Sequence, residues 1–153
     1  MLPVSSAPSR RTLYLPGARL QDLAAIRAFL HSAAIELGVD DSTIPDLVIA
    51  VNEAAANILR HGYPGKTGPI EIEVEREPEN IVIRLRDEAP PFDPTTVASP
   101  DLSVPLELRR AGGLGVHLTR TGVDEMTHSA LHHEGNELTL VKSLRDQERG
   151  TGG

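Results

Sequence analysis

The sequence of 153 residues contains no cysteine, no tryptophan and only four other aromatic residues, two phenylalanines and two tyrosines. The absence of cysteine excludes disulfides, thiolate catalysis and cysteine-ligated metals. Four aromatic residues are too few for a base-stacking platform or an aromatic cofactor cage. Fifteen Lys and Arg against 22 Asp and Glu give a net charge of −7, which argues against broad binding to a nucleic-acid backbone.

Long apolar runs are also missing. No stretch approaches the ~20 apolar residues that cross a bilayer, and residues 1–8 lack the charged and apolar regions of a secretory signal. We therefore expect a cytoplasmic protein that binds neither a membrane nor nucleic acid directly. The length and a hydrophobic content of 39% fit one globular domain. We place it at residues 10–145, with flexible tails at 1–9 and 146–153.

The first half of the chain combines one strand with two helices. Alternation predicts a strand over residues 12–15, and apolar residues at helical spacing predict a helix over residues 20–37. A second helix is expected to start near Thr43, where Asp46 completes a capping box, and to end at Gly62.

A hairpin follows, with strands at 70–77 and 81–86 joined through residues 78–80. Ile70, Ile72 and Val74 alternate with three glutamates in the first strand, which predicts an antiparallel sheet with one solvated face. The glutamate row is interpreted as that solvated face, balanced by neighbouring arginines, rather than as an acidic binding strip.

The second half begins with a proline-rich segment at residues 90–113, which is predicted to be a long loop. A short helix over 115–121 and strands near 123–128 and 137–143 complete the pattern. The order of elements predicts an α/β fold, a two-layer α/β sandwich whose mostly antiparallel sheet carries helices on one face.

Three segments contain polar or glycine-rich residues that could bind a ligand. Glu53 and Asn57 lie one helical turn apart at the flank of an apolar helix face, in a stripe with Asp46, Ala50 and His61. Asp87 ends a strand, where a carboxylate can accept a hydrogen bond from a base amine or simply cap a turn. A Gly-rich turn at 112–115 precedes a helix, as phosphate-binding turns do. Each feature alone also has a purely structural explanation.

Together these segments resemble the anti-sigma factor serine kinases, a bacterial branch of the Bergerat-fold (GHKL) ATPases. Residues 46–58, Asp-Leu-Val-Ile-Ala-Val-Asn-Glu-Ala-Ala-Ala-Asn-Ile, look like the N-box and continue into His61-Gly62-Tyr63. Residues 87–94 are similar to the G1 box, and residues 112–118, Gly-Gly-Leu-Gly-Val-His-Leu, are similar to the G2 box. Residues 135–142 resemble the closing strand of that fold.

The resemblance implies a role for each matching residue. Glu53 would be the base that activates a serine hydroxyl, and Asn57 would hold Mg²⁺. Asp87 would recognise the adenine amino group, Thr139 would support the adenine side of the pocket, and residues 95–111 would form the ATP lid. The nucleotide-binding set expected from the motifs and from His61, one turn beyond Asn57, is Asn57, His61, Asp87, Ala89, Gly112, Gly113, Leu114, Gly115, Val116 and Thr139.

The function implied is an ATP-dependent serine protein kinase that is also an anti-sigma factor. Its partners would be a sigma factor and an anti-anti-sigma (STAS) protein that carries the phosphorylated serine, with ATP and Mg²⁺ as cofactors. A homodimer is a further implication. A stand-alone histidine-kinase-like ATPase is disfavoured, because the sequence shows no dimerisation helix with a phosphoacceptor histidine.

One position departs from the family pattern, because Ala89 stands where the G1 box has glycine. If this position needs a positive φ or close contact with adenine, the methyl group costs about 1–2 kcal/mol. Ala89 therefore supports an alternative, a non-catalytic nucleotide-binding module that regulates by protein binding alone. Glu53 and Asn57 favour the kinase.

Three further histidines, His128, His132 and His133, lie close together in the sequence. They fall near a predicted hairpin turn and have no assigned fourth ligand. We interpret them as surface histidines rather than as a metal site.

Overall fold

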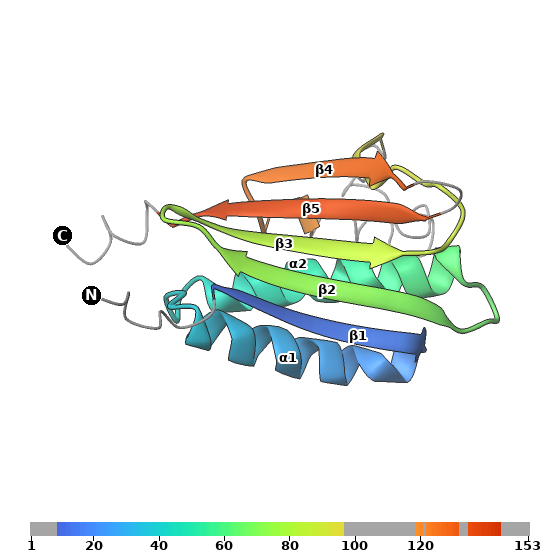
Figure 1. Ribbon diagram of the computed structural model, residues 1–153, viewed down its shortest axis with the longest axis horizontal. Coiled ribbons are helices and arrows are strands. Elements are labelled where there is room, and N and C mark those ends of the chain that lie inside the picture. The colour runs from blue at the N-terminus through green and yellow to red at the C-terminus, as the bar shows by residue number, and fades with distance from the viewer. Residues whose placement is uncertain (1–8, 97–118, 121, 132–134, 145–153) are drawn as a thin grey trace, which may run out of the picture.

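In the computed structural model, a sheet and a layer of helices stack against each other (Figure 1). The structure describes residues 9–96, 119–120, 122–131 and 135–144. Within these residues, the helices lie on one face of the sheet and leave the other face uncovered (Figure 1). The two-layer α/β sandwich predicted from the sequence is confirmed.

Five strands of the described residues form one sheet in the order β1-β2-β3-β5-β4, and every neighbouring pair is antiparallel. The predicted hairpin corresponds to β2 and β3, and the two predicted C-terminal strands correspond to β4 and β5. The first strand is longer than expected, because it passes Pro16-Gly17 with a register shift between Leu15 and Ala18. The strand bounds are Arg10–Ala18 (β1), Gly68–Arg76 (β2), Asn80–Asp87 (β3), Glu125–Ala130 (β4) and Asn136–Ser143 (β5).

The helical layer consists mainly of α1 and α2, which pack side by side on the inner face of the sheet (Figure 1). A 3-10 turn, η1, leads into α1, and a π-helical turn, η2, extends α2. A further 3-10 turn, η3, follows β3. The bounds are Leu20–Asp22 (η1), Leu23–Glu36 (α1), Ile44–Asn57 (α2), Ile58–Gly62 (η2) and Pro94–Thr96 (η3).

The capping box predicted at Thr43 is wrong. Thr43 is the N-cap of α2, but its backbone is already helical, with φ −89° and ψ −31°, and its side chain makes no capping hydrogen bond. A side-chain cap needs an extended backbone at this position. Here the chain enters the helix through a preceding turn, in which the Thr43 and Ile44 amides donate to the Asp40 carbonyl.

Most of the predicted proline-rich loop and the short helix at 115–121 lie outside the described residues, as do nearly all residues of the predicted tails. What the structure describes of the proline-rich segment is its beginning, residues 90–96. Arg120 contacts these residues. Its Nη2 donates hydrogen bonds to the carbonyls of Pro94 and Thr95 at 3.1 and 2.5 Å.

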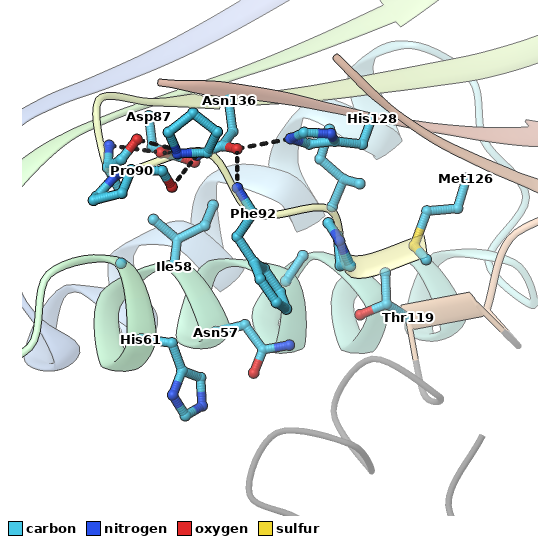
Figure 2. A pocket seen from close by; sticks show the side chains of 16 residues that line it. Asn57, Ile58, His61, Asp87, Pro90, Phe92, Thr119, Met126, His128 and Asn136 are labelled. Atoms are coloured by element: carbon cyan, nitrogen blue, oxygen red, sulfur yellow. Dashed lines mark hydrogen bonds between the residues drawn. The ribbon is translucent and has the colours of Figure 1, made fainter. Parts of the chain in front are cut away.

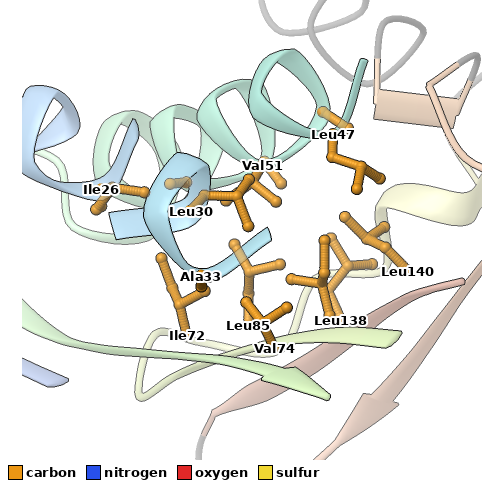
Figure 3. Packing of buried hydrophobic residues seen from close by; sticks show 14 of the residues in the cluster. Ile26, Leu30, Ala33, Leu47, Val51, Ile72, Val74, Leu85, Leu138 and Leu140 are labelled. Carbon is orange, nitrogen blue, oxygen red and sulfur yellow. The ribbon is translucent and has the colours of Figure 1, made fainter. Parts of the chain in front are cut away.

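The core lies between the two layers (Figure 3). Successive side chains along each strand point alternately to the inner and the outer face of the sheet, as predicted for β2. One row of branched side chains therefore faces the helices. Figure 3 shows side chains from α1, α2 and the strands meeting there. Those less than 2% exposed include Ile26, Leu30, Leu47, Val51, Ile72, Val74, Leu85 and Leu140.

The outer face of the sheet carries a network of ion pairs in place of a second layer. Arg84 Nη1 lies 2.9 Å from Glu73 Oε1 and 3.0 Å from Glu75 Oε1. The glutamate row is therefore balanced by arginines, as predicted, although Glu73 is only 8% exposed and is more enclosed than a solvated strand residue. The network comprises Arg10, Glu71, Glu73, Glu75, Arg84, Arg86 and Glu137, from β1, β2, β3 and β5.

Two side chains of α2 test this layering. Leu47 is 1% exposed in the core, and Ile49 is 47% exposed on the opposite side of the same helix. We expect Leu47→Ala to lower the free energy of unfolding by about 2–5 kcal/mol, because it leaves a cavity. Ile49→Ala should change it by no more than about 0.5 kcal/mol. Urea unfolding measures both, and equal losses for the two variants would contradict the orientation of α2.

Candidate functional site

A cavity of about 200 Å³ lies between the α2–η2 helix and the inner face of the sheet. Figure 2 shows its lining side chains, which come from three parts of the chain. The helical side contributes Ala54, Asn57, Ile58, His61 and Gly62; the segment after β3 contributes Ala89, Pro90, Pro91, Phe92 and Pro94; and the remaining wall comes from Asp87, Thr119, Met126, His128, Asn136 and Leu138. Most of these side chains are apolar, so the few polar ones determine what the cavity can bind.

Asp87 is the carboxylate of this cavity. It is the last residue of β3, is 5% exposed, and lies directly opposite Asn136 in the β3–β5 register. Its Oδ1 accepts hydrogen bonds from Asn136 Nδ2 at 2.9 Å and from the Ala89 amide at 2.8 Å. Burial raises the pKa of Asp87, and these two hydrogen bonds oppose that shift.

Asn136, the first residue of β5, joins the strand to the segment that follows Asp87. Besides Asp87, its Nδ2 contacts the carbonyl oxygens of Ala89 at 3.3 Å and Pro90 at 3.2 Å. Its Oδ1 accepts the Phe92 amide at 2.8 Å. The motifs did not single out Asn136. Its position opposite Asp87 depends on the pairing of two strands that are distant in sequence.

His128, on the edge strand β4, contacts Asn136. Its Nε2 lies 2.7 Å from Asn136 Oδ1, and its Nδ1 lies 4.0 Å from Asp93 Oδ1. The His128 side chain is only 8% exposed, so its interpretation as a surface histidine is wrong. The even-numbered side chains of β4 point inward beside those of β5, and the sequence showed the turn but not this pairing. His132 and His133 lie outside the described residues.

Tyr63 holds the other side of the same segment. Its hydroxyl accepts the Glu88 amide at 2.7 Å and donates to the Pro69 carbonyl at 2.8 Å. Burial raises the pKa of this phenol, and the hydrogen bond from the Glu88 amide opposes the shift. Gly68 lies under the ring, where an added Cβ would come within 2.4 Å of Tyr63. The tyrosine that closes the N-box therefore fixes the backbone immediately after Asp87.

Ala89 is 3% exposed and borders the cavity. Its methyl group faces Gly62 at the end of η2, where an added Cβ would lie 2.7 Å from the Ala89 Cβ. Real Cβ atoms do not approach so closely, so the helix end can pass Ala89 only because residue 62 is glycine. The position at which the chain departs from the G1 pattern is thus packed against the end of the N-box.

The expected helical stripe is partly assembled at the cavity. Asn57 and His61 both line it, one turn apart on the helix (Figure 2). Glu53 is half-buried and lies one turn before Asn57, outside the set of described lining residues. Asp46 is exposed in the first turn of α2 and is not a lining residue either.

Thr139 does not reach the cavity. It pairs with Arg84 and Thr127 on the outer side of the sheet, because alternate residues of β5 face opposite sides. The expectation that Thr139 supports the adenine side of the pocket puts it on the wrong face, and Asn136 and Leu138 take that place. The predicted nucleotide-binding residues Gly112, Gly113, Leu114, Gly115 and Val116 lie outside the described residues.

The described residues contain no group of three or more His, Cys, Asp or Glu side chains that could hold a metal ion. None of their helices is long and apolar enough to cross a membrane.

This arrangement, a cavity with a buried carboxylate between a helix and an antiparallel sheet, agrees with the comparison to known protein families. The family of histidine kinase-like ATPase domains matches residues 17–142, and the chain belongs to this family.

Among characterised proteins, the chain is similar to serine-protein kinase RsbW of Bacillus cereus (strain Q1) and of Bacillus anthracis. Each is 28% identical over 135 residues, which cover 86% of this chain and 83% of the relative. The resemblance to the anti-sigma factor serine kinases is thereby confirmed.

The burial of Asp87 has a measurable cost. Its raised pKa means that the folded state binds the proton more tightly than the unfolded state, so the charged carboxylate lowers stability as the pH rises above about 4. Asp87→Asn keeps an oxygen that can accept from Asn136 and from the Ala89 amide. We expect this variant to be at least as stable as the wild type at about pH 7, with the difference shrinking toward about pH 4.

Asp93→Asn is the matched control for this pH series. The hydrogen bond from Thr95 lowers the pKa of Asp93, so its charge contributes stability above about pH 4 that is lost as the pH falls. The variant should therefore be less stable than the wild type at about pH 7. Urea unfolding across this pH range measures both, and the same sign for the two variants would contradict the assignment.

The contact between Gly62 and Ala89 predicts a coupled pair of substitutions. Gly62→Ala should destabilise the protein, because the two methyl carbons cannot both fit at 2.7 Å. In the Ala89→Gly background, the same Gly62→Ala change should cost markedly less. Thermal unfolding of the four proteins gives the coupling energy, about 0.5–3 kcal/mol for residues in contact. Simple additivity would show that these backbones do not approach each other.

Proposed function

We propose that this protein is an ATP-dependent serine protein kinase and anti-sigma factor. Its substrate is a serine on an anti-anti-sigma (STAS) protein, and its second partner is a sigma factor. The observation that carries the proposal is the single cavity lined by both Asp87 of the G1 box and Asn57 of the N-box. The similarity to the RsbW serine-protein kinases supports the choice of a serine as phosphate acceptor.

In this proposal the adenine base occupies the Asp87 end of the cavity. Both hydrogen bonds to Asp87 from the described residues end on Oδ1, so Oδ2 is available to accept a base amine. The apolar walls made by Ile58, Met126 and Leu138 suit the faces of a purine ring. The phosphates extend along the helix toward Asn57, and the Gly-rich segment 112–118 of the G2 box completes their binding.

Asn57 is suited to Mg²⁺, because a hard oxygen donor beside nucleotide phosphates is the environment this ion prefers. The described residues offer no all-protein metal cage, which fits an ion held largely by the phosphates and water. When bound, Mg²⁺ neutralises charge on the phosphates. The chain's own part is to hold the nucleotide at Asp87 and to present Asn57 at the cavity wall.

Glu53 is the general base in this proposal. The serine oxygen of the partner attacks the γ-phosphorus, its proton passes to the Glu53 carboxylate, and the bond from the γ-phosphorus to the bridging oxygen breaks. The products are phosphoserine and ADP. Glu53 stands on the helix beyond the described lining residues, where a serine presented by a partner protein would enter.

Glu53→Gln separates the kinase from a binding module. The substitution removes the basic carboxylate but keeps its size, so transfer of labelled γ-phosphate to a STAS partner should fall by about 10²–10⁴-fold. Nucleotide affinity measured by calorimetry should change little. A wild-type protein that binds its partners but transfers no phosphate would favour the alternative that Ala89 supports, a nucleotide-binding regulator without catalysis.

Asn57→Ala should weaken Mg²⁺-dependent nucleotide binding and phosphate transfer together. Asn52→Ala is its matched control, since Asn52 is a half-buried asparagine on the same helix that instead accepts from Arg27 at 2.9 Å. The control should retain both activities. An equal loss in both variants would assign the effect to the helix rather than to Asn57.

A further inference from the structure

The segment after Asp87 cannot form all of its backbone hydrogen bonds within itself. Pro90 and Pro91 have no amide hydrogen, so the carbonyls of Ala89 and Pro90 and the amide of Phe92 need partners from elsewhere. Asn136 supplies all three contacts with one side chain, at 2.8–3.3 Å. The Asn136 amide therefore satisfies the proline-containing part of the cavity wall, whereas Tyr63 holds the preceding residue, Glu88.

The direction of that amide is determined by its surroundings. Backbone carbonyls can only accept and the Phe92 amide can only donate, so Nδ2 must face the carbonyls and Oδ1 must face Phe92. His128 Nε2 lies 2.7 Å from the same Oδ1 and must therefore donate to it. His128 thus carries its proton on Nε2 and holds Asn136 in the orientation that directs Nδ2 at Asp87 (Figure 2).

We propose that His128 and Asn136 are a positioning pair that gives the cavity its preference for a base with an amino group. Resting on the proposed nucleotide function, the inference goes beyond it by naming the residues that set selectivity. Asn136 Nδ2 and the Ala89 amide occupy Oδ1 of Asp87, which leaves Oδ2 as an acceptor for a group bound in the cavity that Asp87 lines. An amino group satisfies that acceptor, whereas a carbonyl oxygen at the same position meets it as a second acceptor.

The electrostatics support the same assignment. Burial raises the pKa of Asp87, whereas the Asn136 hydrogen bond and the charge of a protonated His128 act in the opposite direction. Loss of the pair would therefore raise the pKa of Asp87 further, toward the protonated carboxyl, which can donate to a carbonyl-bearing base.

ATP and ITP are the probes, because they differ at the base position where an amino group replaces a carbonyl oxygen. We expect the wild type to bind ATP about 10–100-fold more tightly than ITP, because a buried acceptor that faces a second acceptor lowers the affinity by about this factor. Asn136→Ala should reduce this ratio to about threefold or less. His128→Leu should lower it several-fold, and His128→Gln, whose amide can still donate, should restore it.

Leu138→Ala is the matched control, since Leu138 is a 6% exposed apolar residue of the same cavity wall. Its loss should weaken both nucleotides alike and leave the ratio of the two dissociation constants unchanged. A merely structural role for Asn136 or His128 predicts this same behaviour. Wild-type ratios in His128→Leu and Asn136→Ala, measured by calorimetry on folded protein, would overturn the inference.

A second measurement needs no nucleotide and covers an Asn136 variant that fails to fold. Hydrogen exchange of the Phe92 amide, observed by NMR, should speed up in His128→Leu and return to the wild-type rate in His128→Gln. Unchanged exchange in His128→Leu would also overturn the pair. If the wild type binds neither ATP nor ITP, the proposed function fails, whereas equal binding of the two leaves that function standing and removes only the selectivity inference.

Discussion

The hydrogen-bonded pairing of Asp87 with Asn136 is the interaction on which this molecule depends. It joins the ends of two neighbouring strands, β3 and β5, and it places a carboxylate under the helical layer. A buried carboxylate needs hydrogen-bond donors, and here the two groups that donate to Oδ1 also belong to, or hold, the adjacent segment. The cavity, its polar end and the path of the chain after β3 therefore share one set of contacts.

Much of this fold follows from local sequence. Alternating Ile, Val and Glu specify β2 and its two faces, and helical spacing specifies α1 and α2, because one face of each element must be buried. The motifs also identified Asp87, Asn57 and His61 as residues that the structure brings to one cavity. Local patterns failed to predict how the chain enters α2. They predicted a capping box at Thr43, whereas the chain reaches the helix through a preceding turn.

The remaining errors concern residues whose surroundings are made by distant strands. Asn136 and His128 belong to different strands, and neither has a local signal that distinguishes a buried polar residue from an exposed one. Thr139 was assigned from its motif, but parity along β5 turns it outward with Arg84. Residues of this kind become predictable only when strand order and register are known. The charged outer face of the sheet shows the same dependence, because its ion pairs link four strands.

The distance along the chain between Asp87 and Asn136 has a consequence for folding. They are 49 residues apart in sequence, so the binding cavity exists only after a long segment has closed and β5 has docked on β3 in the correct register. Closure of a long segment is slow and entropically costly. The recognition end of the cavity is thus absent from partly folded chains with only the N-terminal helices and hairpin in place. A ligand held by this pairing can select the completed sheet but cannot guide its early assembly.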